Sequence, residues 1–151
     1  MQKKFPNDYP SDLLERIIED GAKEQLLTVY RICNDGIINR DAFNSSFVDN
    51  KNRISTKKGL INRDTALIEN IGNYSTSCFE DYKEIKRILR MMQKYHPEPI
   101  IAQGVTNPGC GLSLRITESK FRKGRGSHVD WWIYENTTPQ NYFNAYKKEG
   151  E

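Results

Sequence analysis

The chain has 151 residues, of which 36% are hydrophobic and 28% are charged, and it carries a net charge of +3. This length predicts one domain with one hydrophobic core, and eight tyrosines, six phenylalanines and two tryptophans help to fill it. The sequence lacks both an apolar run of about 18 residues and the apolar stretch of a signal peptide. We therefore expect a single soluble, cytoplasmic domain over residues 1–151, with no membrane contact.

The first predicted elements are a short helix and a buried strand. The helix runs from Leu13 to about Gly21, with Ser11 placed as its N-cap and the glycine at its C-terminal end. Residues 26–33 are apolar and β-branched, which is typical of a buried strand, and residues 34–36 predict a turn. No firm element follows, and three apolar side chains are expected to anchor the irregular stretch to the core: Ala42, Phe43 and Phe47.

The clearest predicted helix lies in the middle of the chain. Ser77 and Glu80 have the spacing of a capping box, and apolar residues recur at helical spacing over residues 79–92. Pro97 disfavours helix at the residue before it, so the helix is expected to end at His96.

Three more strands are predicted, one from residue 100 to near Gly104 and the others over residues 112–117 and 127–134. Thr138 as N-cap and Pro139 at the first helical position predict a short terminal helix, packed through Tyr142, Phe143 and Tyr146. The fold class is therefore α+β, with a mixed or antiparallel sheet and about three helices.

The strand over residues 127–134 holds the most unusual pattern. Alternation puts His128, Asp130, Trp132 and Tyr134 on one face. A histidine two residues from an aspartate on one face can form a hydrogen-bonded pair that serves proton transfer or holds a ligand. The alternative is a solvated polar face with the two aromatic rings at its rim. The opposite face predicts ordinary core packing: Val129, Trp131 and Ile133.

Hydroxyl groups cluster in the segment Tyr74-Ser75-Thr76-Ser77, beside the predicted start of the central helix. Free backbone amides at a helix N-terminus bind anions, so this segment could hold a phosphate or a nicotinamide ribose. The simpler interpretation has Ser77 capping the helix, Thr76 favouring a strand and Tyr74 in the core.

Arg31 lies in an otherwise apolar strand. An unpaired buried charge is very costly, so this guanidinium must be paired or must reach a cleft. It either binds a phosphate or carboxylate of a ligand, pairs with a carboxylate of the chain, or points outward from an edge strand.

Two basic stretches, Lys51–Arg63 and Lys120–Arg125, could contact a nucleic-acid backbone, although only Phe121 offers an aromatic ring among them. No metal is expected, because the two histidines lie 32 residues apart and the cysteines match no zinc spacing. Cys110 lies between two glycines and is predicted to be the exposed thiol of three reduced cysteines.

A first strand ending in Val29-Tyr30-Arg31, followed by the segment Tyr74–Ser77, resembles the start of ADP-ribosyltransferase-like domains, including the RES subgroup. The resemblance implies an NAD pocket in which Arg31 grips the phosphates and Ser75 to Ser77 line the nicotinamide ribose. It also implies a catalytic glutamate on a later strand, for which Glu135 is the nearest candidate.

Two functions are therefore predicted. The first is a small nucleotide-binding domain of ADP-ribosyltransferase type that uses NAD. Its catalytic residues would be His128, Asp130 and Glu135, and Trp132 and Tyr134 would join the cofactor-binding set. The second is a non-catalytic phage or defence-associated protein that binds a protein or nucleic-acid partner. Its lysine- and asparagine-rich composition favours this alternative, and its marker would be an exposed patch at Trp131 or Trp132.

Overall fold

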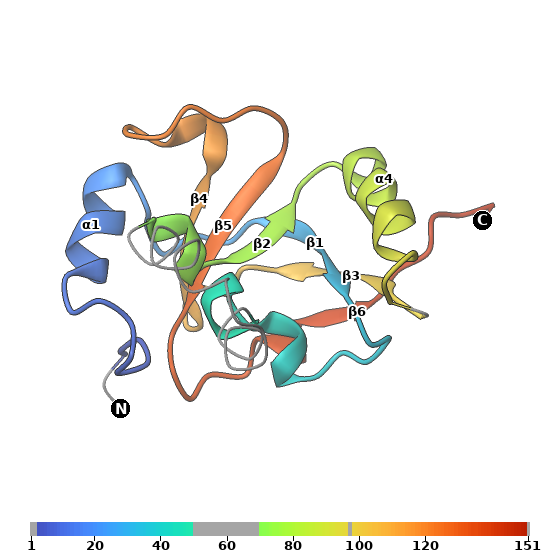
Figure 1. The fold of residues 1–151 in the computed structure, drawn as a ribbon, viewed down its shortest axis with the longest axis horizontal. Helices are drawn as coiled ribbons and strands as arrows, with labels where there is room; N and C mark the ends of the chain where they lie inside the picture. The colour runs from blue at the N-terminus through green and yellow to red at the C-terminus, as the bar shows by residue number, and fades with distance from the viewer. Residues whose placement is uncertain (1–2, 50–69, 97, 151) are drawn as a thin grey trace, which may run out of the picture.

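The computed structural model describes residues 3–49, 70–96 and 98–150, and it confirms an α+β fold (Figure 1). A six-stranded sheet in the order β4-β5-β2-β1-β3-β6 forms the centre of this part of the chain. Every strand pair in the sheet is antiparallel. Within the described ranges, no helix has both the length and the apolar character needed to cross a membrane.

The described elements comprise two longer helices, several short 3-10 helices and six strands. The two longer helices are α1 (Leu13–Asp20) and α4 (Tyr82–Met92). Short 3-10 helices are η1 (Arg40–Phe43), η2 (Ile71–Tyr74), η3 (Ile116–Glu118) and η4 (Pro139–Tyr142). The strands are β1 (Thr28–Cys33), β2 (Thr76–Phe79), β3 (Ile100–Val105), β4 (Gly111–Arg115), β5 (His128–Ile133) and β6 (Phe143–Ala145).

The first helix begins and ends where the sequence predicts, but its N-cap lies one residue later than expected. Gly21 has a φ of 120°, a value that favours glycine, and its amide donates to Ile17 and Ile18. The N-cap is Asp12 rather than Ser11, and its side chain makes no capping bond.

The predicted capping box of Ser77 and Glu80 is wrong. Residues Thr76–Phe79 form β2 and pair with β5, so Ser77 is extended and lies opposite Asp130. Helix α4 begins at Tyr82, where Asp81 accepts the amide hydrogen of Lys83. Pairing with a distant strand therefore overrides the local helix signal.

The predicted terminal helix begins where expected, with Thr138 as N-cap and Pro139 at the first position, but it is a single 3-10 turn that ends at Tyr142. Its predicted continuation is wrong, because Phe143–Ala145 forms β6 and pairs with β3. Strand β3 ends at Val105, close to its predicted end, and contains Gly104, whose position allows the close approach of β6. A Cβ atom at Gly104 would lie 2.2 Å from the carbonyl oxygen of Tyr142.

Apolar side chains cover both faces of the sheet. On one face, Val129, Trp131 and Ile133 join a core cluster with Phe143, which confirms their predicted packing. On the other face, one cluster around α1 contains Trp132, and a second cluster lies under α4. Figure 1 shows α1 and α4 at opposite ends of this face. The polar side chains of β2 and β5 lie between them.

The sheet opens between β1 and β2. These two strands pair at one position, Tyr30 opposite Phe79. Beyond it, η1 lies against both strands. Thr76 Oγ1 on β2 donates to the carbonyl of Phe43 at 2.6 Å, and Arg31 Nε on β1 donates to that of Ala42 at 3.1 Å.

Candidate functional site

A cleft of about 260 Å³ lies at the opening between β1 and β2. Arg31, Ser75 and Ser77, three of the predicted site residues, line it. Its apolar lining comes from β1, β2 and α4: Ile32, Phe79, Ile88 and Met92. Asp49 and a third hydroxyl, that of Ser46, also line it. A cleft that combines a cation, a carboxylate, three hydroxyls and an apolar wall suits a ligand that carries an anionic group, hydroxyl groups and a ring.

Arg31 is held in this cleft by backbone carbonyls. Its Nη1 donates to the carbonyl of Ser77 at 2.9 Å, and its Nε donates to that of Ala42 at 3.1 Å. Within the described ranges, the groups that position the guanidinium are these two neutral carbonyls. An arginine held in this way can bind an anionic group of a ligand.

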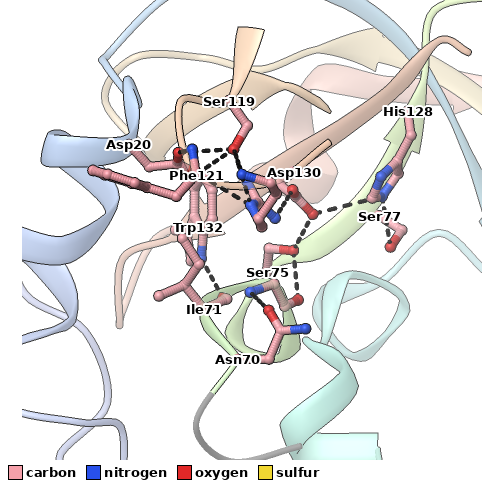
Figure 2. Close-up of polar contacts among 12 residues, drawn as sticks. Asp20, Asn70, Ile71, Ser75, Ser77, Ser119, Phe121, His128, Asp130 and Trp132 are labelled. Atoms are coloured by element: carbon pink, nitrogen blue, oxygen red, sulfur yellow. Dashed lines mark hydrogen bonds and ion pairs between the residues drawn. The ribbon is translucent and has the colours of Figure 1, made fainter. Parts of the chain in front are cut away.

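The serines that line the cleft contact the predicted His–Asp pair (Figure 2). Ser75 Oγ donates to Asp130 Oδ1 at 2.7 Å, and His128 Nε2 lies 3.1 Å from Ser77 Oγ. The same histidine nitrogen is 3.6 Å from Asp130 Oδ1. Because β2 and β5 pair with Ser77 opposite Asp130, these four side chains share one face of the sheet. The structure therefore brings together Arg31, Ser75, Ser77, His128 and Asp130.

Two ion pairs next to the site, both made by Arg122, were not predicted from the sequence. Arg122 reaches from the loop after η3 to two carboxylates, with its Nε 3.1 Å from Asp20 Oδ2 and its Nη1 2.6 Å from Asp130 Oδ2. Asp20 is fully buried and also accepts hydrogen bonds from the Ser119 hydroxyl and the Phe121 amide. Arg122 was predicted only as part of an exposed basic loop, and it instead points inward.

The solvated-face alternative for β5 is wrong, because Asp130 and Trp132 are buried. Trp132 Nε1 donates to the carbonyl of Ile71, and its ring packs in the cluster around α1. Tyr134 is also buried in this cluster. Burial and the neighbouring carboxylate of Glu24, which accepts its hydroxyl hydrogen, raise the pKa of Tyr134 well above its usual range. Both rings thus have structural partners away from the cleft.

The remaining predicted site residues also lie outside the cleft lining. Tyr74 is buried in the core, and Thr76 is bound to the Phe43 carbonyl. Glu135 follows β5 at the end opposite His128, where its amide donates to the carbonyl of Lys4. The structure does not bring Glu135 together with Arg31.

Three further predictions concern other parts of the chain. Lys51–Arg63 lies outside the described residues. The exposed thiol predicted at Cys110 is wrong, because that side chain is 4% exposed and burial raises its pKa. No group of three or more potential metal ligands is found within residues 3–49, 70–96 and 98–150.

Asp20 is expected to make stability depend on pH. Burial alone would raise its pKa, but hydrogen bonds from Ser119 and Phe121 and the charge of Arg122 hold the pKa below its usual value. A lowered folded-state pKa contributes stability above about pH 4, and this contribution is lost as the pH falls through the folded pKa. Urea unfolding at decreasing pH should therefore show a smaller acid-induced loss for Asp20→Asn than for the wild type. An equal loss of unfolding free energy in the two proteins as the pH falls would contradict this expectation.

Comparison of the chain with protein-family models, curated proteins and solved structures finds no match. Function is therefore inferred from the geometry of the cleft and its hydrogen-bonded neighbours.

Proposed function

We propose that the chain is a small nucleotide-binding domain that uses NAD for ADP-ribosyl transfer. One observation carries the proposal: Arg31, Ser75 and Ser77 line one cleft, and His128 and Asp130 are in contact with those serines. The arginine provides charge for a diphosphate, and the hydroxyls provide hydrogen bonds for a ribose. These are the residues and roles that the resemblance to ADP-ribosyltransferase-like domains implies.

The cleft is slightly smaller than a typical ligand-binding pocket, so it would hold only one end of a dinucleotide. A ligand-binding pocket usually has a volume of about 300–1,000 Å³, and this cleft has about 260 Å³. Bound NAD would supply an ADP-ribosyl group: the bond between nicotinamide and ribose would break with its electron pair on nicotinamide, and the ribose carbon would bond to an acceptor nucleophile, either water or a protein side chain, whose proton would pass to His128 or to solvent. The apolar side chains of Phe79 and Ile88 offer a surface for a flat ring, while Arg31 holds the anionic part.

Asp130 is the acidic residue that we assign to this site. It lies on β5, directly opposite Ser77, whereas Glu135 lies beyond the other end of the strand. Both oxygens of Asp130 are engaged, one by Ser75 and the other by Arg122. We therefore assign Asp130 as a positioning residue that orients Ser75. His128 is the group available to exchange a proton, because its side chain is 27% exposed.

The proposal predicts that NAD or ADP-ribose stabilises the protein. A ligand at 100 times its dissociation constant adds about 2.7 kcal/mol to the free energy of unfolding, which a thermal-shift measurement detects. His128→Ala should remove this shift while the fold is retained. His96→Ala is the control, because it removes a histidine other than the one whose Nε2 lies 3.1 Å from the hydroxyl of Ser77 in the cleft. The absence of any shift with NAD and with ADP-ribose, together with no release of nicotinamide, would overturn the proposal.

The non-catalytic alternative lacks, on β5, the marker predicted for it. It predicted an exposed aromatic patch at Trp131 or Trp132, and both side chains are fully buried. A protein or nucleic-acid partner is therefore not assigned to this strand.

A further inference from the structure

The exposed side of α4 carries a stripe of positive charge. Lys83, Arg87 and Arg90 follow at intervals of four and three residues, so they project from one face of the helix over about 10 Å. All three are exposed, and Lys94 continues the stripe just beyond the helix. The stripe does not face the cleft, which α4 lines with Ile88 and Met92.

The C-terminal segment runs beside this helix (Figure 1). The two bound a groove of about 710 Å³, whose charged lining consists of five basic and two acidic side chains. The basic side chains come from both segments: Lys83, Lys86, Arg87, Arg90 and Lys148. The acidic ones are Asp81 and Glu149. The five basic and two acidic side chains give the groove a net charge of +3, which is as large as the net charge of the whole chain. The groove therefore attracts a polyanion.

An apolar groove of about 460 Å³ adjoins the basic one, and Tyr82 and Lys86 line both. Tyr146 also lines it, on the C-terminal segment. The ring centroids of Tyr82 and Tyr146 are 5.2 Å apart. Both rings also pack against Tyr30, with centroid distances of 5.5 Å for Tyr82 and 5.1 Å for Tyr146. Because the three rings pack against one another, Tyr82 and Tyr146 form an ordered aromatic surface next to the basic side chains of α4.

We propose that this double groove binds single-stranded nucleic acid. The phosphates would lie along the stripe of α4, and the bases would enter the apolar groove against Tyr82 and Tyr146. A duplex keeps its bases stacked inside, and an acidic peptide offers carboxylates without flat rings, so neither uses both grooves. The surface lies on another side of α4 from the NAD cleft, and binding here is independent of NAD use.

Charge-neutralising variants test the contribution of the stripe. Arg87→Gln with Arg90→Gln keeps good helix formers and should weaken binding of a labelled single-stranded oligonucleotide of about twelve nucleotides, measured by fluorescence anisotropy. If both residues contact phosphate, the slope of log K against log salt should fall in magnitude by about 1.4. Lys123→Gln with Arg125→Gln removes the same charge from the exposed loop after η3 and should leave the slope unchanged. An equal loss in the two double variants would overturn the proposal.

A second variant separates nucleic acid from an acidic protein partner. Tyr146→Leu keeps apolar volume but removes a stacking ring, and it should weaken oligonucleotide binding about tenfold. A polyglutamate peptide tested in parallel should bind more weakly than the oligonucleotide and should not respond to this variant. If polyglutamate binds as tightly as the oligonucleotide and Tyr146→Leu changes neither, the groove recognises acidic protein and the proposal is wrong. No saturable binding of the oligonucleotide at about 50 mM salt would also overturn it.

Discussion

Replacement of Arg122 by methionine is expected to lower the free energy of unfolding by about 3 kcal/mol. The guanidinium bridges Asp20 and Asp130, whose side chains are 0% and 2% exposed. Methionine fills the space of the arginine stem but leaves two buried carboxylates without this cation. Removal of one partner from a buried ion pair is costly because the remaining charge is neither solvated nor paired.

Urea denaturation of the wild type and the variant measures this loss. Lys123→Met is the matched control, because it removes an exposed cation from the same loop and should change stability by less than about 0.5 kcal/mol. Adding Asp20→Asn to the Arg122 variant removes one of the unpaired charges, so part of the lost stability should return. A loss below about 1 kcal/mol, with no recovery in the double variant, would show that the carboxylates do not depend on Arg122.

The Arg122 contacts also connect the scaffold to the candidate site. Asp20 ends α1 and Asp130 lies on β5, so one side chain fixes a helix, a loop and a strand together. Asp130 in turn accepts the hydroxyl hydrogen of Ser75, which lines the cleft. We therefore expect substitutions of Arg122 to affect the proposed NAD binding through the position of Ser75.

The parts of the fold that the sequence predicted correctly are those with a strong local cause. Gly21 ends α1 because its φ is positive, and the β-branched run before Asn34 forms β1. The errors at Ser77 and Phe143 have the opposite origin. Both residues stand in segments that resemble helix starts, yet each pairs with a strand more than 30 residues away in sequence. Local propensity does not contain that information.

The candidate site was predictable to a similar extent. Ser75, His128 and Asp130 were found because serine runs and a His–Asp alternation are visible within single segments. Asp20 and Arg122 were missed because they are 102 residues apart and neither has an unusual neighbour in sequence. Only the tertiary fold, which places the loop after η3 against the end of α1, turns these two ordinary surface-type residues into a buried pair.

Replacement of Arg31 by lysine is expected to reduce NAD turnover by about 100-fold, if the proposed function is right. Lysine keeps the charge but loses the planar fork that now donates to the carbonyls of Ala42 and Ser77. Without those two anchors the cation no longer has a fixed position in the cleft. The ligand's anionic group would then be held by a mobile point charge, and the ribose would lose its alignment with Ser75.

Two measurements check this prediction: release of nicotinamide from NAD, and the dissociation constant of ADP-ribose by calorimetry. In Arg31→Lys, nicotinamide release should fall and the dissociation constant of ADP-ribose should rise. Arg31 is proposed to hold the diphosphate, which NAD and ADP-ribose share. Arg115→Lys is the control. That arginine ends β4 and pairs with Glu80 at 2.7 Å, so its substitution should leave both values unaffected. If Arg31→Lys keeps both within about twofold of the wild type, Arg31 does not bind the ligand and is held in the cleft for structural reasons alone.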